Sequence, residues 1–392
     1  MNRTTQEKST GSEFRQNLAQ FEFAIIGGGI AGASLAYELA KAGRTIAIFE
    51  KETTPGYHST GRSASFYAPV YGNHTVRCLT KLSGAFYHSP PSEFCEHPLL
   101  SPRGALFVSD QNNEPHLNDL YDSIKDLSAD VKLSGREFAL SKVPVFLEEG
   151  VSACVWDPES YEIDVAALHQ SYLKQSKLLG TQLFVGSEID AIEEIDRGWI
   201  IKTQGSEFMV KTIINAAGAL CDQIAKMAGI EGVGLQPMKR SVCIVPVSNE
   251  YQIKDWPLVI DVNEAFYFKP EGDSLLISPA DETPVEPMDA FTEQLDIATA
   301  IERVSNVINV PLDTVSREWA GLRSFVQDKS PVIGFEPGSE KFFWFAGQGG
   351  YGIQMADGAA RLASSLLMSK PIPKELSKMN FELSAVAVER FR

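Results

Sequence analysis

Three glycines near the start of the chain have the spacing of a nucleotide-binding turn. Gly27, Gly29 and Gly32 form G-x-G-x-x-G directly after an apolar run. Glu50 lies 18 residues after Gly32, at the end of the next apolar run. Gly27 permits a tight turn, Gly29 lets the backbone approach a pyrophosphate, and Gly32 lets a helix pack close to the strand. Glu50 can accept a hydrogen bond from a ribose hydroxyl. The pattern predicts an adenine dinucleotide site; the alternative is a tight turn without a ligand.

Two further loops of small residues follow apolar runs later in the chain. Residues 215–218 read NAAG, and residues 346–354 read AGQGGYGIQ before a helical pattern. Small side chains let the backbone approach a ligand closely, and a helix N-terminus directed at a redox ring would stabilise negative charge there. Because a nicotinamide enzyme usually needs only the first glycine-rich unit, three such loops favour FAD. For the last loop, the alternative is an ordinary strand-to-helix connection.

Arginine and tyrosine residues supply the candidate substrate chemistry. An arginine binds a carboxylate through two parallel hydrogen bonds and so fixes its orientation, which hydride transfer to a flavin requires. Arg323 lies between apolar neighbours, Arg240 begins a strand-like run, and Tyr267 alternates within another. The alternatives are surface ion pairs for the arginines and a core position for the tyrosine. No Ser/His/Asp or Cys/His arrangement stands out among the six histidines.

Composition excludes several classes of partner. The net charge of −16 disfavours nucleic acid and anionic membrane surfaces. The five cysteines form no C-x-x-C pair, which indicates a reducing compartment with neither a disulfide framework nor a metal site. No apolar run is long enough for a transmembrane segment, and the polar first 20 residues contain no secretory signal. We expect a cytoplasmic protein with a mobile tail at residues 1–20.

The elements that must position these residues alternate between strand and helix at the start, middle and end of the chain. Residues 164–179 have helical spacing, residues 182–185 and 199–203 resemble strands, and residues 242–278 are rich in strands. We predict an α/β fold. A Rossmann-like, glutathione-reductase-like FAD-binding domain would comprise residues 21–90, 155–235 and 326–392. An inserted α+β substrate-binding domain, built on a mostly antiparallel sheet, would comprise residues 91–154 and 236–325.

Several longer strings make the chain resemble the D-amino-acid oxidase-like flavoproteins. Within that family, the strings are most similar to those of the bacterial FAD-dependent D-arginine dehydrogenases. They are PGYHSTGRSA at 55–64, FCEHPLLSPR at 94–103, ALHQ at 167–170, AGLRSF at 320–325 and QGGYGIQ at 348–354.

The resemblance implies a role for individual residues. Arg240, Arg323 and Tyr267 would hold the substrate carboxylate, and Tyr71 and Tyr351 would line the pocket. The FAD-binding residues would be Gly27, Gly29, Ala31, Gly32, Glu50, Lys51, Ser59, Thr60, Gly61, Arg62, Ser63, Ala64, Gly218, Gly349, Gly350, Tyr351, Gly352, Ile353 and Gln354. FAD would be bound non-covalently; attachment through His58 is the alternative.

Two positions depart from the D-arginine dehydrogenase pattern. Ala105 replaces a glutamate that holds the substrate guanidinium, and Phe66 replaces a histidine near the substrate. A cationic side chain would lose its charge partner, so we expect oxidative deamination of a neutral or apolar D-amino acid. The alternatives are an N-substituted amino acid, as in sarcosine or glycine oxidases, a 2-hydroxy acid, or a flavin-binding module without catalysis. The electron acceptor, artificial, quinone-type or oxygen, stays open.

Overall fold

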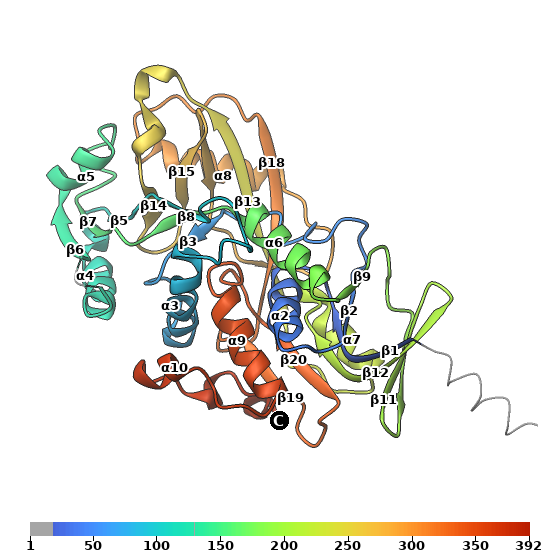
Figure 1. The fold of residues 1–392 in the computed structure, drawn as a ribbon. Helices are drawn as coiled ribbons and strands as arrows, with labels where there is room; N and C mark the ends of the chain where they lie inside the picture. The colour runs from blue at the N-terminus through green and yellow to red at the C-terminus, as the bar shows by residue number, and fades with distance from the viewer. Residues whose placement is uncertain (1–18, 129) are drawn as a thin grey trace, which may run out of the picture.

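The computed structural model describes residues 19–128 and 130–392 and contains two large sheets (Figure 1). The central strands of the first sheet are parallel, in the order β20-β12-β1-β2-β9, while β10 and β11 extend it antiparallel along one half of β12 and β19 pairs antiparallel with β20. Its strands are β1 (Ala19–Ile26), β2 (Ile46–Phe49), β9 (Gln182–Phe184), β10 (Ala191–Ile195), β11 (Gly198–Thr203), β12 (Ser206–Asn215), β19 (Val332–Phe335) and β20 (Phe342–Ala346).

Helices cover this parallel sheet and bury its central strands. All four residues of β2 are buried, as expected for a parallel strand covered on both faces. Helix α2 packs between α6 and α9, and α3 packs on α9 (Figure 1). The helices of this part are α2 (Ile30–Lys41), α3 (His74–His88), α6 (Val165–Leu178), α7 (Cys221–Met227), α9 (Ala356–Leu367) and α10 (Lys374–Lys378). The predicted helix at 164–179 is therefore present, with Asp164 as its N-cap.

The second sheet is mostly antiparallel, with the order β17-β13-β16-β15-β14-β5-β7-β6, and β18 pairs with β13. Within the described part of this second sheet, only the β5–β14 pair is parallel. Its strands are β5 (Ala105–Ser109), β6 (Lys132–Gly135), β7 (Ala153–Asp157), β13 (Gln236–Pro246), β14 (Leu258–Asp261), β15 (Tyr267–Glu271), β16 (Ser274–Ser278), β17 (Thr283–Pro284) and β18 (Arg317–Phe325). Helices α4 (Glu114–Ile124), α5 (Arg136–Lys142) and α8 (Gln294–Ser305) accompany it.

Short elements complete the chain. A small antiparallel sheet joins β3 (Phe66–Tyr67), β8 (Tyr161–Ile163) and β4 (Leu100–Pro102). Single 3₁₀ turns occur at Gln111–Asn113, Gly218–Leu220, Asn249–Tyr251, Ile253–Asp255, Leu383–Ala385 and Val388–Phe391. None of the described helices is long and apolar enough to cross a bilayer.

The predicted α/β fold with a mostly antiparallel second sheet is confirmed. The proposed boundaries between the two domains remain a proposal, and β7 lies across the one at residues 154 and 155. Most of the predicted tail at residues 1–20 lies outside the described residues, although Ala19 and Gln20 already belong to β1.

Candidate active site

A long cavity runs from the glycine turn to the face of the second sheet. Its outer part is lined by the turn after β1, by residues 49–60, and by residues 216–227 with residues 287–289. Its inner part is lined by residues 59–71, β18 and the loop at residues 345–354. Both parts share Gly29, Ser59, Thr60, Ala216, Gly218 and Leu322. The three glycine-rich segments predicted from the sequence therefore meet at one cavity.

Backbone crowding explains two of the three glycines in the first turn. Gly27 has φ +106°, and a Cβ there would lie 2.4 Å from the Ala216 carbonyl oxygen. A Cβ at Gly32 would lie 2.0 Å from the Gly27 carbonyl oxygen. A side chain at either position would push β1, β12 or α2 apart, so the turn requires glycine for packing.

Glu50 both lines the cavity and forms a hydrogen bond with the glycine turn. Its carboxylate lines the outer part and accepts hydrogen bonds from the Gly28 N–H at 2.8 Å and the Glu52 N–H at 2.9 Å. Each oxygen retains a further lone pair that a ribose hydroxyl can use. Sequence reasoning missed this second task of Glu50, because the two backbone partners are set by the shape of the turn.

His169 forms a hydrogen bond with the same glycine turn. Its Nε2 lies 2.8 Å from the Gly28 carbonyl oxygen, and burial lowers the pKa of the ring. The neutral imidazole therefore donates to the carbonyl and keeps the turn in place. The string ALHQ indicated this segment, although the sequence suggested no role for the histidine.

Thr60 and Ser59 join the glycine turn to the second sheet. The Thr60 Oγ1 accepts the Ile30 N–H at 3.0 Å, which caps α2 from a distant segment. The Ser59 hydroxyl donates to the Leu322 carbonyl at 2.6 Å on β18. The N–H of Ile30 therefore has a partner within the protein and is not free for a phosphate.

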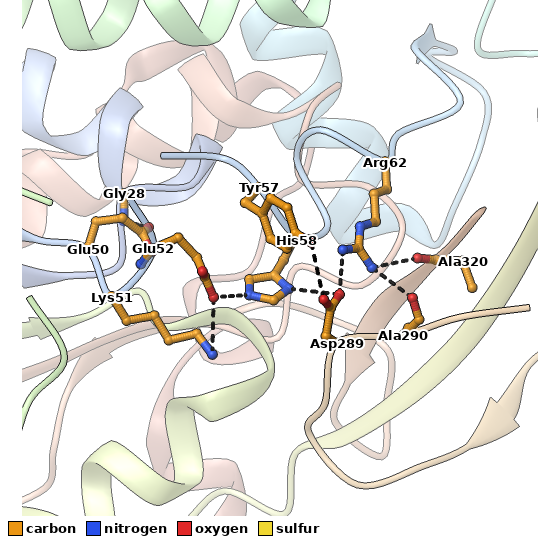
Figure 2. A network of polar contacts seen from close by, with 10 residues as sticks. All are labelled: Gly28, Glu50, Lys51, Glu52, Tyr57, His58, Arg62, Asp289, Ala290 and Ala320. Atoms are coloured by element: carbon orange, nitrogen blue, oxygen red, sulfur yellow. Dashed lines mark hydrogen bonds and ion pairs between the residues drawn. The ribbon is translucent and has the colours of Figure 1, made fainter. Parts of the chain in front are cut away.

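A polar network closes the outer part of the cavity (Figure 2). The Arg62 guanidinium donates to the Ala290 and Ala320 carbonyls, each at 2.9 Å, and pairs with Asp289. The Tyr57 hydroxyl also donates to Asp289, at 3.2 Å. The hydrogen bond from Arg62 lowers the pKa of the Asp289 carboxyl. These contacts fix the loop at residues 287–290 over the segment that follows Glu50.

The same network extends to the residues beside Glu50 (Figure 2). His58 Nε2 lies 2.8 Å from Glu52 Oε1, and Lys51 Nζ lies 3.5 Å from the same oxygen. The hydrogen bond with His58 lowers the pKa of the Glu52 carboxyl. Lys51 lines the outer part of the cavity as predicted, whereas its cofactor contact stays a prediction.

Some predicted cofactor residues take internal roles instead of facing the cavity. The Gly61 N–H donates to the Gly56 carbonyl at 2.7 Å within a turn, and Gly61 lines neither cavity part. Gly32 lies within α2 and faces Gly27. Arg62 lines the inner part, but its guanidinium is held by the protein. By contrast, these predicted residues do line the cavity: Gly27, Gly29, Ala31, Ser63, Ala64, Gly218, Gly349, Gly350, Gly352, Ile353 and Gln354.

Arg323 lies on β18 in the inner part of the cavity. It contacts Tyr71 and lies near Tyr267, and no carboxylate among the described residues pairs with it. Burial lowers the pKa of the guanidinium, but the hydroxyl oxygens of Tyr71, Tyr267 and Tyr351 together outweigh that effect, so the pKa ends above its ordinary value. Burial raises the pKa of the Tyr71 hydroxyl, which therefore stays protonated. The site thus contains a fixed positive charge without a negative partner.

Arg240 differs from Arg323 because it already has partners. Its Nε donates to the Asp281 carbonyl at 2.7 Å, and a second nitrogen lies 3.2 Å from Glu282 Oε1. The guanidinium also lies 5.9 Å from the centre of the Tyr267 ring. Arg240 lines the cavity as predicted, yet much of its charge is compensated within the protein.

Tyr351 lies beside the pocket, outside its lining. Its ring packs against Tyr71 at 5.3 Å and against Phe325 at 6.0 Å, and it is absent from the lining of both cavity parts. Burial raises the pKa of its hydroxyl. Tyr351 therefore supports the ring of Tyr71, and its contact with substrate or FAD stays a prediction.

Apolar side chains form a wall in the same inner part of the cavity that Arg323 lines. Phe66, Val242, Leu258 and Ile260 line the inner part. Ala105 is fully buried and pairs with Leu258 in the neighbouring strand, so it lies beside Leu258 on the same face of the sheet, and it is not among the residues that line the cavity. Glu264 is the one carboxylate in the described lining of the inner part, and it is exposed on the turn between β14 and β15.

The family is decided by a match over most of the chain. The family described as DAO, FAD-dependent oxidoreductase, matches residues 22–366. The chain belongs to this family of FAD-dependent oxidoreductases.

Individual relatives agree with this assignment. The chain is 24% identical to glycine oxidase of Bacillus subtilis over 91% of its own length and 95% of that protein. It is 23% identical to human mitochondrial dimethylglycine dehydrogenase, covering 96% of the chain but 46% of that protein. Among solved structures, glycine oxidase from Geobacillus kaustophilus superposes with a TM-score of 0.81 at 19% identity, covering 94% of this chain and 98% of that one. L-proline dehydrogenase from P. horikoshii gives 0.78 at 22% identity, covering 91% and 96%.

The cavity of this FAD-dependent oxidoreductase fits its cofactor. The outer part offers the crowded glycine turn and Glu50, and the inner part offers backbone from the loop at residues 346–354, which contains an orphaned buried donor, Gln348 Nε2. Gly349 donates its N–H to the Ser324 carbonyl at 3.0 Å, which fixes this loop against β18. When bound, FAD supplies a flavin ring that accepts two electrons from the substrate.

Asp357 is a buried acid that sequence reasoning missed. It lies in the first turn of α9, is 2% exposed, and its Oδ2 has no hydrogen-bond partner among the described residues. Burial raises the pKa of its carboxyl to about 7. The only signal in the sequence is an aspartate in the first turn of an otherwise apolar helix. The backbone N–H of Asp357 lies 3.4 Å from the Tyr87 hydroxyl, Arg361 Nη1 lies 3.9 Å from the Asp357 Oδ2, and Asp357 does not line the cavity.

Proposed function

We propose that this enzyme oxidises the Cα–N bond of a small amino acid with a neutral or apolar side chain, in the D configuration. Arg323 carries this proposal, because it is a cation in the inner cavity without a carboxylate partner among the described residues. An isolated buried charge is costly, and a substrate carboxylate would compensate it. With FAD bound as the two-electron acceptor, the substrate would lose a proton from nitrogen and a hydride from Cα, and water would hydrolyse the resulting imine to a 2-oxo acid and ammonia.

Orientation is the contribution that the protein makes to this reaction. A guanidinium that holds both carboxylate oxygens fixes the direction of the Cα–H bond. The Tyr71 hydroxyl contacts Arg323, and Tyr267 lies near Arg323 in the lining of the same inner part of the cavity. Burial raises the pKa of the Tyr71 hydroxyl, so it can donate a further hydrogen bond to the carboxylate. The reaction requires no nucleophile from the protein, because the flavin would accept the electrons.

The apolar wall supports the choice of a neutral side chain. Phe66, Leu258 and Ile260 line the same inner part as Arg323 and would contact the side chain of a substrate bound there. A lysine-like or arginine-like substrate would place its charge against these side chains unless it reached the exposed Glu264. Desolvating that charge without a partner would cost several kcal/mol. The D configuration follows from the resemblance alone, as does non-covalent binding of FAD.

An N-substituted amino acid is the second candidate substrate. Two of the relatives are named glycine oxidase and dimethylglycine dehydrogenase. An N-methyl group would add apolar surface, which the wall of the pocket can contact. A 2-hydroxy acid would use the same carboxylate anchor. A cytoplasmic location also belongs to this proposal, supported by five cysteines that are all free.

Anaerobic bleaching of the flavin tests the proposal. Purified enzyme is mixed with D-alanine, D-valine, D-arginine, D-lysine, sarcosine, dimethylglycine and lactate, and loss of absorbance is followed. Fastest reduction by D-alanine or D-valine supports the first proposal, and fastest reduction by sarcosine supports the second. Fastest reduction by D-arginine or D-lysine contradicts both, and a flavin that stays oxidised with all of them indicates a non-catalytic module. Adding air or a quinone afterwards identifies the electron acceptor.

A further inference from the structure

Gln348 carries a buried hydrogen-bond donor without a partner. The residue lines the inner part of the cavity, and its side-chain Nε2 is buried with no partner among the described residues. An unsatisfied buried amide donor costs about 1–3 kcal/mol. Such groups are rare in folded proteins and are commonly completed by a ligand or an ordered water. The position of this amide inside the cofactor cavity points to a ligand.

The backbone around Gln348 holds the side chain in place. The flanking residues Gly347 and Gly349 have φ +66° and +54°, which favours glycine on both sides. The Gln348 carbonyl accepts the Tyr351 N–H at 3.0 Å, and Gly349 is bonded to β18 as described above. A Cβ at Gly352 would lie 2.9 Å from Gln348 Oε1, so the oxygen side of the amide is crowded by the loop. The nitrogen is therefore the end left to bind something else.

Gln354 in the same loop provides the contrast. Its Nε2 donates to the Tyr71 carbonyl and its Oε1 accepts the Ala68 N–H, each at 3.4 Å. Both ends of the Gln354 amide form hydrogen bonds within the protein, whereas the Gln348 nitrogen has no hydrogen-bond partner among the described residues. The two glutamines thus have different tasks despite their shared loop.

We propose that the side-chain amide of Gln348 donates a hydrogen bond to FAD and positions it in the inner cavity. The acceptor is an oxygen or nitrogen of the flavin ring or an oxygen of the adjoining ribityl chain. Gln348 is therefore a positioning residue for the cofactor, and this holds whichever substrate the enzyme oxidises. A donor to the ring would also favour the reduced flavin, because the ring gains negative charge on reduction.

The test measures FAD release from the purified holoenzyme. We expect Gln348→Leu to weaken FAD binding about tenfold, the equivalent of one hydrogen bond. The control variant, Gln111→Leu, alters an exposed glutamine far from the cavity and should leave FAD affinity unchanged. A two-electron midpoint potential lowered by about 30 mV, which is a tenfold change in the reduction equilibrium, would place the acceptor on the ring. An unchanged potential with weakened binding would place it on the ribityl chain.

Two further measurements keep the proposal open to refutation. The apoprotein of Gln348→Leu should melt no lower than wild-type apoprotein, since the removed donor has no partner in the protein. Gln348→Glu keeps the shape but replaces the donor, and it should weaken binding at least as much as leucine. FAD affinity within twofold of wild type in both variants would overturn the proposal. So would a glutamate variant that retains full affinity, because the amide would then act as an acceptor.

Discussion

Replacing Arg323 tests the reasoning about the substrate site most directly. Arg323→Met removes the cation and keeps much of the side-chain volume. Each hydrogen bond between charged groups contributes about 1.5–3 kcal/mol, so losing a two-bond contact should cost about 3–6 kcal/mol. At about 1.4 kcal/mol per factor of ten, kcat/KM should fall about 10²–10⁴-fold. The assay is anaerobic flavin reduction by the best amino acid of the panel over a range of concentrations.

Matched variants separate this role from folding. Arg323→Lys keeps the charge but loses the planar fork, so its kcat/KM should lie between wild type and methionine. Arg240→Met removes a guanidinium that bonds Asp281 and Glu282, and part of its effect should appear as a lower melting temperature. FAD content should stay near wild type in both Arg323 variants. A kcat/KM within threefold of wild type for Arg323→Met, with FAD bound, would refute the assignment of Arg323 as carboxylate anchor.

Three other predictions follow from the geometry. Asp357→Asn should abolish a pH dependence of the free energy of unfolding. Between about pH 4 and 7 the folded protein keeps a proton on Asp357, whereas the unfolded chain, in which the carboxyl has a pKa of 3.8, has released it. The stability of the wild-type protein should therefore fall as the pH rises through this range. The asparagine variant should therefore be more stable at pH 8, by at most about 4 kcal/mol in urea unfolding, and equal curves at pH 5 and 8 for wild type would contradict this. Asp289→Asn should speed FAD release a few-fold at low salt, because Asp289 is 56% exposed and its ion pair with Arg62 is screened; identical release rates would count against the closing role of the network. Gly350→Ala places a Cβ 2.9 Å from the Arg323 guanidinium and should raise KM with FAD retained, whereas Gly135→Ala, which meets nothing within 4 Å, should not.

The arginines, the two loop glutamines and Ala105 show which features of the site could not be predicted from the sequence. Arg240 and Arg323 were predicted alike, but the carboxylate that pairs with Arg240 lies 42 residues away in sequence. Gln348 and Gln354 belong to one string, and only the packing against residues 68–71 distinguishes them. Ala105 was expected near the substrate, whereas the fold buries it beside Leu258 and outside the lining of the cavity. Each of these outcomes depends on contacts between segments far apart in the chain.

The sequence by itself determined the dinucleotide turn, the strand and helix pattern of the fold, and the choice of FAD. These features are local: spacing decides whether a backbone can turn at Gly27, and apolar periodicity decides which elements form. Only the tertiary structure decided which polar groups remain free for a ligand. Arg62 and Arg240 are compensated by carboxylates and carbonyls from distant loops, while Arg323 and the Gln348 nitrogen are left facing the cavity. Partners decide function here because a buried polar group is stable only when something satisfies it.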